Sequence, residues 1–460
     1  MKVSVRNKLI ITEYPKAVLD WCNKNLILPN PEYHKKERMG LWVGNTPRNI
    51  WLYEQVGDEL RIPFGCVQDI YKSFDNIDFD YQIQPIRKVS YHSNINLYPY
   101  QDNAVKSVLK CKNGILVMPC GAGKTQTALE IIVRLGGRAL WLTHTQDLLN
   151  QSKNRAKSTL NCSNKAFGSI TAGKVEIGTH ITFATVQTMC KLDLSAYRDI
   201  WDIIIVDECQ HCCGSPTKVT QFYKVISSLS ARYKIGLTAT PKRADGLEKS
   251  MFALLGGVIY EVSREEVADT TCPVKVISCE TDYMPDYDAV LMGDGTINYA
   301  RLVDDMIHDK DRFKFVLETI EKLPANNPVL VLANRVEYLA KLNSEYFGRS
   351  NFLSAMGNSK SAKEERKRAL QALNDGDIDC LFATYQLAKE GLDVPNLRYV
   401  VFATPEKDET TITQAVGRVG RKADGKEYGT VIDFIDDFGM YRGWAKKRRS
   451  YYKKIDAEIL

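Results

Sequence analysis

Short apolar runs that alternate with helical stretches constrain the fold of this chain more than any other feature. A continuous apolar run of four to six residues is typical of a parallel strand that is buried on both faces. The intervening segments, such as residues 124–134, have the spacing of amphipathic helices. Such alternation predicts an α/β domain with a doubly wound parallel sheet. The candidate strands are residues 114–118, 139–142, 181–184, 203–206, 234–237, 328–333, 380–383, 399–403 and 430–434.

The candidate strands fall into two blocks, which predict two tandem α/β domains. Residues 1–96 precede them with a mixed pattern and turn signals such as Pro29-Asn30-Pro31, which indicate a small α+β accessory domain. The sequence between the two blocks is irregular. We therefore expect an accessory domain over 1–96, α/β domains over 97–262 and 311–440, a connector over 263–310 and a C-terminal tail over 441–460.

Charge is concentrated at the C-terminal end. The whole chain of 460 residues has a net charge of only +6, which is weak evidence for a polyanionic partner. Residues 441–460, in contrast, contain seven basic and two acidic side chains. They form either a solvated helix face or a phosphate-contacting segment, and the interleaved Trp444, Tyr451 and Tyr452 would help the second.

The cysteine content indicates a reducing compartment. Twelve cysteines occur without the short framework of a disulfide-rich secreted domain. Cys209 and Cys212 have metal-ligand spacing, but no second pair follows at zinc-finger spacing, so no zinc is expected. Residues 1–20 lack a signal-peptide core and no apolar run approaches a bilayer span. We expect a cytoplasmic protein, in the host cytoplasm if a phage encodes it, with no membrane partner.

A glycine-rich turn follows the first strand of the first block and opens a helix. It reads Met118-Pro-Cys-Gly-Ala-Gly-Lys-Thr125, which resembles a P-loop except that Met118 replaces the first glycine. Glycines let backbone amides approach phosphate oxygens, and the helix N-terminus adds partial positive charge. We expect Lys124 to reach the β- and γ-phosphates of ATP and Thr125 to coordinate Mg²⁺. The predicted nucleotide-binding residues are Gly121, Ala122, Gly123, Lys124 and Thr125.

Two carboxylates end the apolar run at 203–206. Asp207 and Glu208 follow it directly, about 80 residues after the P-loop. A strand end beside a P-loop is where a second magnesium ligand is needed. We expect Asp207 to hold the metal and Glu208 to orient and deprotonate the attacking water.

Further motifs occur in the order typical of the superfamily-two DExH/D-box helicases, which the chain resembles from residue 97 to 438. They are Leu97-Tyr-Pro-Tyr-Gln101, Asp207-Glu-Cys-Gln210, Gly236-Leu-Thr-Ala-Thr-Pro241, Thr384-Tyr-Gln-Leu-Ala-Lys-Glu-Gly-Leu-Asp-Val-Pro395 and Gln414-Ala-Val-Gly-Arg-Val-Gly-Arg421. The resemblance implies two RecA-like domains that hydrolyse ATP and move along nucleic acid. Gln210 stands where many relatives have His or Asp, and whether His211 substitutes for it is open.

The resemblance also implies roles for residues outside the P-loop. It implies that Gln101 reads adenine. It implies that Gly391 and Asp393, in the motif at the domain interface, contact the nucleotide. Arginine fingers would come from a helix on which residues three apart share a face. The catalytic residues so implied are Lys124, Glu208, Gln414, Arg418 and Arg421. The implied nucleic-acid contacts are Thr143, Thr185, Arg243 and Thr384, although a solvated turn is an equal interpretation for Arg243.

The P-loop and the segment 236–246 look most like the XPB and UvsW group. That resemblance favours DNA over RNA, branched, forked or duplex substrates, and 3′-to-5′ movement, with the accessory domain binding DNA. The alternatives are an RNA helicase, a duplex translocase without strand separation, a nucleic-acid clamp or sensor, and the motor of a restriction complex. ATPase stimulation by RNA, duplex DNA and forked DNA separates the first two from the preferred interpretation.

Overall fold

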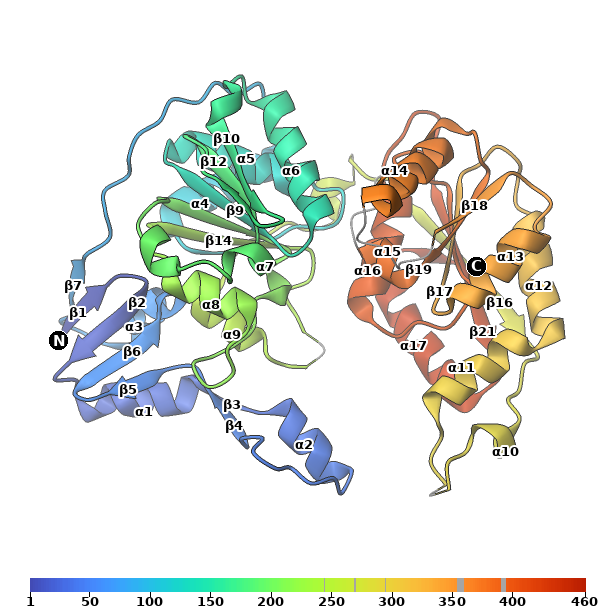
Figure 1. Cartoon of the computed structure of the whole chain (residues 1–460), viewed down its shortest axis with the longest axis horizontal. Helices are drawn as coiled ribbons and strands as arrows, with labels where there is room; N and C mark the ends of the chain where they lie inside the picture. Colours follow the sequence, from blue (N-terminus) through green and yellow to red (C-terminus); the bar gives the residue numbers. More distant parts are fainter. Residues whose placement is uncertain (244, 269, 294, 354–359, 390–393) are drawn as a thin grey trace. The chain divides into compact units, whose positions relative to one another are not determined.

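The computed structural model describes residues 1–460 except 244, 269, 294, 354–359 and 390–393. The described residues divide into two compact units, Met1–Glu266 and Val267–Leu460. Each unit has its own hydrophobic cores. In Figure 1 the first unit runs from blue to yellow-green and the second from yellow to red.

A five-stranded sheet opens the first unit. Its order is β5 (Glu54–Val56), β6 (Glu59–Pro63), β2 (Lys8–Thr12), β1 (Lys2–Val5), β7 (Asp78–Tyr81), with only the β1–β7 pair parallel. Alternate residues of β1 and β2 are fully buried, as in a sheet that covers a core with one face. The helices α1 (Lys16–Asn25) and α3 (Val67–Ser73) add Val18, Cys22 and Ile70 to that core. This is the small α+β domain that the sequence predicts.

A projection leaves this accessory domain. Its stalk is the antiparallel pair β3 (Ile27–Pro29) and β4 (Asn49–Trp51), and it carries α2 (Pro31–Arg38). Figure 1 shows α2 beyond the stalk, away from the five-stranded sheet.

The accessory domain packs on the rest of the first unit at a glycine. A Cβ on Gly65 would lie 2.4 Å from Gly256 N and 2.5 Å from Phe252 O, so the backbones approach too closely for any side chain. Nearby, Lys234 is fully buried: its Nζ donates to Ile226 O at 2.9 Å and lies 4.7 Å from the centre of the Phe64 ring.

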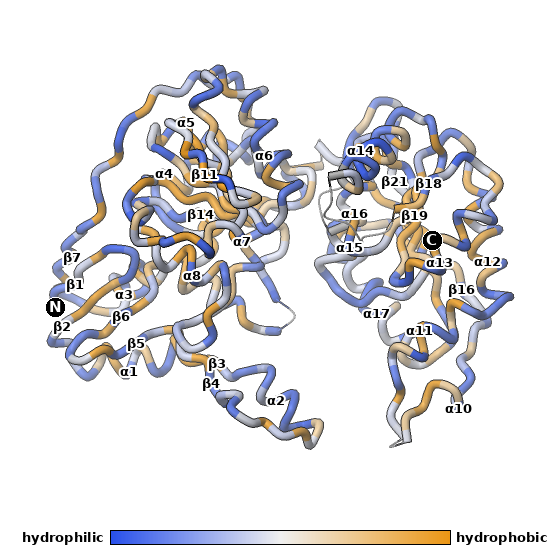
Figure 2. Tube along the Cα trace, viewed as in Figure 1, coloured by the Kyte–Doolittle hydropathy of each residue, from blue (hydrophilic) through white to orange (hydrophobic). Residues whose placement is uncertain are grey.

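An eight-stranded sheet forms the centre of the first unit. It is parallel except for β11, which is antiparallel to β10. Every residue of the central strands β9 and β13 is buried, because helices cover both faces. Figure 2 shows these inner strands largely orange, the hydrophobic end of its scale. The strand order is β11 (Lys174–Glu176), β10 (Phe167–Thr171), β12 (Ile181–Thr185), β9 (Ala139–Thr143), β13 (Ile203–Asp207), β14 (Tyr233–Thr238), β8 (Gly114–Val117), β15 (Val258–Glu261). The helices are α4 (Pro99–Cys111), α5 (Lys124–Leu135), α6 (Gln146–Thr159), α7 (Val186–Met189), α8 (Gln221–Ser228) and α9 (Glu248–Leu255).

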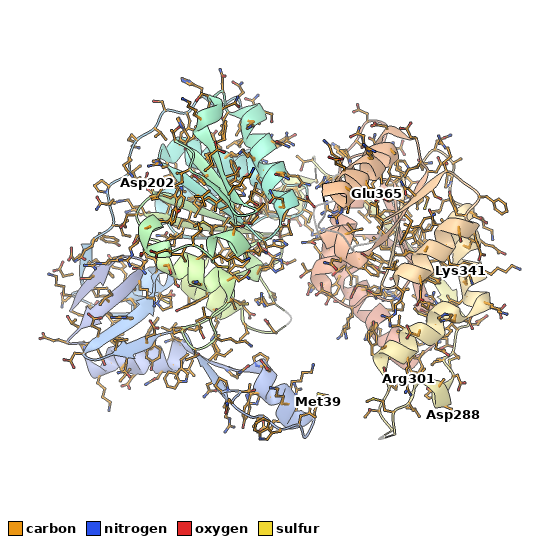
Figure 3. The ribbon with its side chains drawn as sticks, in the orientation of Figure 1. Met39, Asp202, Asp288, Arg301, Lys341 and Glu365 are labelled. Atoms are coloured by element: carbon orange, nitrogen blue, oxygen red, sulfur yellow. The ribbon has the colours of Figure 1, made fainter. Side chains whose placement is uncertain are left out.

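The segment between β7 and α4 is tied to this sheet by a buried carboxylate. Asp202, labelled in Figure 3, accepts from Arg138 N at 2.9 Å and pairs with the guanidinium of Arg87 at 3.1 Å. Because Asp202 is almost fully buried, these donors satisfy a charge that would otherwise be costly.

A seven-stranded parallel sheet forms the second unit. The strand order is β18 (Ser350–Leu353), β19 (Cys380–Thr384), β17 (Val329–Ala333), β20 (Tyr399–Phe402), β21 (Gly429–Asp436), β16 (Val274–Thr281), β22 (Glu458–Ile459). The helices are α10 (Tyr287–Val290), α11 (Tyr299–His308), α12 (Lys310–Glu321), α13 (Val336–Glu345), α14 (Lys360–Asp375), α15 (Tyr385–Lys389), α16 (Glu409–Val419) and α17 (Gly439–Lys454). The nine predicted apolar runs are all strands of the two parallel sheets, so the predicted α/β class with two tandem domains is confirmed.

The structure differs from two expectations about segments. Within the expected connector 263–310, β16 pairs with β21 along its whole length and is part of the second sheet. Within the expected tail 441–460, α17 is a packed helix, with Trp444, Arg448 and Tyr452 buried against the second unit. Both segments fold into the core because their apolar residues face one side only, and a search for continuous apolar runs does not detect such segments.

No helix among the described residues combines the length and the apolar character needed to cross a membrane.

Candidate nucleotide-binding site

The glycine-rich turn lies at the carboxyl end of β8 and leads directly into α5. Gly121 and Gly123 have φ of +89° and +75°, values that favour glycine over residues with a side chain. A Cβ on Gly123 would lie 2.3 Å from Gln101 Nε2, so a side chain there would displace the Gln101 amide from its present position. Helix α5 thus begins with Lys124 and Thr125 directly after the glycine-rich turn. The first turn of a helix presents backbone amides without intrahelical partners, which suits an anion.

Gln101 is fixed against this turn. It is buried on α4, its Nε2 donates to Ala122 O at 2.9 Å, and its Oε1 accepts from Tyr98 N at 3.0 Å. The structure therefore places the Gln101 amide against the backbone of the glycine-rich turn, and its contact with adenine stays a prediction.

The acidic pair lies at the end of β13, two strands from β8 in the same sheet. Glu208 has a left-handed φ of +50°, which a non-glycine residue adopts only at a cost, and its backbone N donates to Asp207 Oδ1 at 3.0 Å. Burial and the charge of Glu208 raise the pKa of Asp207, and Lys124 opposes that rise. Although burial opposes it, the charge of Lys124 and a hydrogen bond from Gln210 hold the pKa of Glu208 below its usual value. Lys124 and the two carboxylates thus act on one another electrostatically.

Gln210 joins this pair to strand β14. Its Nε2 donates to Glu208 Oε2 at 2.8 Å, and its Oε1 accepts from Thr238 Oγ1 at 2.7 Å. Thr238 lies within the segment Gly236–Pro241, which resembles the helicase motif that couples ATP hydrolysis to movement along nucleic acid. The residue that departs from the pattern of many relatives therefore makes hydrogen bonds on both sides.

His211 is exposed, and its ring packs at a tilt of 43° against that of His144, with centroids 4.3 Å apart. His144 directly follows β9, and burial lowers its pKa although Glu208 opposes that shift. The motifs did not single out His144; its place after Thr143 at a strand end was the available signal.

Two of the predicted nucleic-acid contacts are neighbours. Thr143 and Thr185 end β9 and β12 and are paired in register, at the same edge of the sheet as the glycine-rich turn. Both side chains are buried: Thr143 Oγ1 donates to Thr145 O at 3.0 Å, and Thr185 Oγ1 to Thr188 Oγ1 at 3.0 Å. These hydroxyls are bonded within the protein.

Arg243 makes a hydrogen bond and an ion pair within the first unit. Its guanidinium donates to Gln210 O and pairs with Asp245 at 2.7 Å, with 18% of its side chain exposed. The arginine that was expected either in a solvated turn or on nucleic acid is thus a bridge between its own turn and Gln210.

The second unit carries the remaining predicted residues. Gln414 and Arg418 lie on α16, whereas Arg421 lies beyond the helix end at Gly420 and forms an isolated β-bridge with Thr271. The expectation that Arg418 and Arg421 share a helix face is therefore wrong, because α16 ends at Val419. Within the described part of the chain, the buried atoms Gln414 Oε1 and Thr384 Oγ1 have no hydrogen-bond partner. Gly391 and Asp393 lie outside the described residues.

Cys209 and Cys212 belong to the hydrophobic core of the first unit, and burial raises the pKa of both thiols well above its usual value. The described residues contain no group of three or more His, Cys, Asp or Glu side chains that could hold a metal ion. The glycine turn, a lysine and two strand-end carboxylates nevertheless suit a nucleotide with Mg²⁺, which takes one or two carboxylates together with phosphates and water.

Comparisons with known proteins agree with this geometry. Residues 94–243 match the family model "Type III restriction enzyme, res subunit", and residues 311–423 match "Helicase conserved C-terminal domain". A putative ATP-dependent RNA helicase of Acanthamoeba polyphaga mimivirus is 26% identical, over 92% of this chain and 78% of that protein. A DNA 3′-5′ translocase XPB2 of Sulfurisphaera tokodaii is 28% identical, over 72% of this chain and 80% of that protein.

A solved structure shares the fold. The ATP-dependent Type ISP restriction-modification enzyme LlaBIII, bound to DNA, superposes with a TM-score of 0.57 at 18% identity. The match covers 79% of this chain and 30% of that one. The two α/β units therefore have the tandem RecA-like architecture.

Proposed function

This chain belongs to the superfamily-two helicases, ATP-dependent enzymes that act on nucleic acids, and we propose that it remodels branched or forked DNA. The observation that carries the proposal is the hydrogen-bonded path from Glu208 through Gln210 to Thr238. It joins the acidic pair to β14, where the segment Gly236–Pro241 resembles the helicase motif that couples hydrolysis to movement. A site of this construction transmits a change at a phosphate to the strand that follows the acidic pair.

The first unit supplies the residues for phosphoryl transfer. We propose that the amides of Gly121, Ala122 and Gly123 and the Lys124 ammonium bind the phosphates, with Gln101 holding the turn. Thr125 and Asp207 would hold Mg²⁺, which neutralises charge on the phosphates when bound. Glu208 accepts the proton of the attacking water, since its lowered pKa keeps it ionised at neutral pH.

The second unit supplies the arginines. We propose Arg418 and Arg421 as the groups that stabilise charge on the γ-phosphate, a contribution on the order of 10³–10⁵ in rate. Gln414 would position them from the same helix as Arg418. Gly391 and Asp393 are proposed nucleotide contacts from the interface motif.

We propose that DNA contacts the segments that follow the strand ends at Thr143, Thr185 and Thr384 through backbone amides, because the Thr143 and Thr185 hydroxyls are bonded within the protein. Arg243 acts through Gln210 in this account. We assign residues 97–262 as the ATP-binding domain and 1–96 as an accessory DNA-binding domain. Movement in the 3′-to-5′ direction is proposed from the similarity to XPB2.

Two observations support different substrates. Similarity to XPB2 supports DNA, and similarity to the mimivirus protein supports RNA as the second candidate. The test measures strand displacement and ATP hydrolysis on a four-way DNA junction, a forked DNA, a plain DNA duplex and an RNA duplex of equal length. Displacement on the branched DNA substrates supports the proposal. Hydrolysis on DNA without displacement would indicate a translocase, and displacement confined to RNA would replace DNA as the substrate.

A further inference from the structure

The projection of the accessory domain, residues 27–51, ends in an exposed aromatic side chain. Trp42 is 87% exposed, and Met39 and Leu41 beside it are 60% and 54% exposed. Figure 3 labels Met39 at the far end of α2, and Figure 2 shows the mainly blue helix followed by a turn with orange segments. Exposed apolar surface is unfavourable in water, and a cluster of such side chains is typical of an interaction site.

The turn is held in one shape by hydrogen bonds. Leu41 N donates to Lys36 O at 2.9 Å, Thr46 N to Val43 O at 3.0 Å, and Lys36 Nζ to Thr46 Oγ1 at 2.8 Å. Gly40 and Gly44 have φ of +62° and +51°, which places both bends at residues that tolerate them.

The Trp42 ring lies against this turn. A Cβ on Gly44 would be 2.8 Å from Trp42 Cζ3, so the ring covers the backbone there while most of it remains open. A hollow of about 320 Å³ adjoins the ring and is bordered also by Lys36 and Lys218. A tryptophan supported on one side and open on the other is a platform for stacking.

The base of the projection is equally fixed. Asn30 Nδ2 donates to Pro47 O at 2.8 Å, and Asn30 Oδ1 caps α2 by accepting from Glu32 N at 3.1 Å. Glu32 also pairs with Lys36 and with Lys218, each at 3.2 Å, which ties the projection to the central part of the first unit. The projection therefore has hydrogen bonds at its base and an exposed ion pair to Lys218 in the central part of the first unit.

The charge around the platform is positive. Lys35, Arg38 and Arg48 are all exposed, and residues 31–48 hold four basic and two acidic side chains. Residues 282–292 of the second unit also expose apolar side chains, but their surroundings are acidic. There, Met284 and Tyr287 have exposed aspartates as neighbours, namely Asp282, Asp286 and Asp288. An aromatic platform with a cationic rim is complementary to bases and phosphates, whereas the acidic segment repels them.

We propose that the turn 39–44 is a DNA-binding element in which Trp42 stacks on a base exposed at a branch point, while Lys35, Arg38 and Arg48 contact the flanking phosphates. The inference rests on the proposed function, because it names the element that recognises the branched substrate. A base inside a closed duplex has both faces covered, so stacking selects the place where base pairs end.

The test compares the parent protein and its variants in binding to a four-way junction and to a relaxed, covalently closed circular duplex, which has neither ends nor loops. Trp42→Ala should weaken junction binding on the order of tenfold, a typical loss for one base–aromatic stack, and leave binding to the circular duplex unchanged. Trp42→Phe keeps a ring and should keep most of the affinity. The control is Phe347→Ala, which removes a 96% exposed aromatic from the second unit and should change neither.

Two further measurements separate stacking from charge. A 2-aminopurine at the branch point should change its fluorescence with the parent protein and not with Trp42→Ala. The Lys35→Gln/Arg38→Gln variant should reduce the slope of log K for junction binding against log salt concentration by about two, because each phosphate contact contributes about 0.9 to that slope. Unchanged junction affinity in Trp42→Ala, or equal loss on the junction and the circular duplex, would overturn the proposal.

A failure of the proposed function can be distinguished from a failure of the stacking inference. If the parent protein hydrolyses ATP with neither DNA nor RNA, the motor assignment fails regardless of Trp42. If the parent is stimulated by DNA and Trp42→Ala binds junctions equally well, only the stacking inference fails.

Discussion

Gln210 connects Glu208, the carboxylate proposed as the catalytic base, to strand β14. A primary amide donates and accepts at the same time, so one side chain serves Glu208 and Thr238 together. Its backbone carbonyl oxygen accepts from Arg243 as well. A residue that departs from the usual acidic tetrad is thus the centre of the local hydrogen-bond network.

Gln210→Ala should uncouple hydrolysis from movement. Removing both side-chain bonds leaves ATP binding intact but breaks the connection to β14, so strand displacement per ATP hydrolysed should fall about five- to tenfold, as expected for one or two buried hydrogen bonds. Gln210→His, which can also donate and accept, should recover most of it. Equal displacement per ATP in Gln210→Ala and the parent would rule out the coupling role.

Lys234 places a titratable group between the accessory and central domains. Burial lowers its pKa to about 7, against an ordinary value of 10.5. Between these two pH values the unfolded chain binds a proton that the folded chain does not, so the folded state loses stability as the pH falls from 10.5 to 7. Below pH 7 both states are protonated and the penalty is constant.

Lys234→Met removes this titration. Its stability relative to the parent should be greatest near pH 7 and should decline as the pH rises toward 10, by at most about 1.4 kcal/mol per pH unit. Urea unfolding at about pH 7, 8, 9 and 10 measures the difference. The exposed Lys224→Met is the control and should show no such trend. A difference independent of pH would mean that Lys234 titrates normally.

At the scale of elements, the turn between β8 and α5 depends on glycine for two separate reasons. Gly123 needs a positive φ, and its missing Cβ leaves room for Gln101 Nε2. Gly173, in the turn between β10 and β11, has nearly the same φ of +77°, but a Cβ added there would meet no atom within 4 Å.

Alanine variants of Gly123 and Gly173 separate the cost of a positive φ from the cost of the clash with Gln101. Gly173→Ala should cost about 1–2 kcal/mol of stability and leave nucleotide binding unchanged. Gly123→Ala adds a clash with Gln101 and should lower affinity for a fluorescent ATP analogue by more than tenfold. Equal nucleotide affinity in both variants would show that Gln101 does not shape the turn.

Helix α17 is held by a buried ion pair. Arg448 is 1% exposed and lies 2.9 Å from Asp433, which also accepts from Tyr452 Oη at 2.9 Å. The basic segment therefore contributes one of its arginines to the core of the second unit, and the exposed Lys446, Lys447 and Arg449 remain on the surface.

Arg448→Ala should destabilise the second unit by about 3–5 kcal/mol, because it leaves Asp433 buried without its partner. The neighbouring Arg449→Ala should change stability by less than about 0.5 kcal/mol. Thermal unfolding of both variants measures this. Similar unfolding midpoints for the two would contradict a structural role for Arg448.

The elements that the sequence predicts are those buried on both faces. The run Ile203–Asp207 has no polar residue before Asp207, and such strands appear directly as apolar runs. Strand β16 has Lys275, Ser278 and Glu280 between its apolar residues, and for that reason the sequence predicts a connector there. The glycine turn and acidic pair follow from motif spacing, whereas the Gln210 bonds and the left-handed φ of Glu208 depend on tertiary contacts that one sequence does not display.

At the scale of the whole molecule, the chemistry is divided between two α/β units. The first carries the glycine-rich turn, Lys124 and the acidic pair; the second carries Gln414, Arg418 and Arg421. Neither unit holds the complete set of proposed residues, so the proposed mechanism of hydrolysis requires both. Under that proposal, a nucleotide can bias a two-unit chain between states and so perform work on nucleic acid.

The most direct test of the central claim is the rate of ATP hydrolysis by the parent protein and by Lys124→Ala, each with and without a four-way DNA junction. The account predicts strong stimulation of the parent by DNA and loss of turnover in Lys124→Ala, with salt-sensitive DNA binding retained. Normal hydrolysis by Lys124→Ala would contradict it, because the lysine assigned to the phosphates in the glycine-rich turn would then be dispensable.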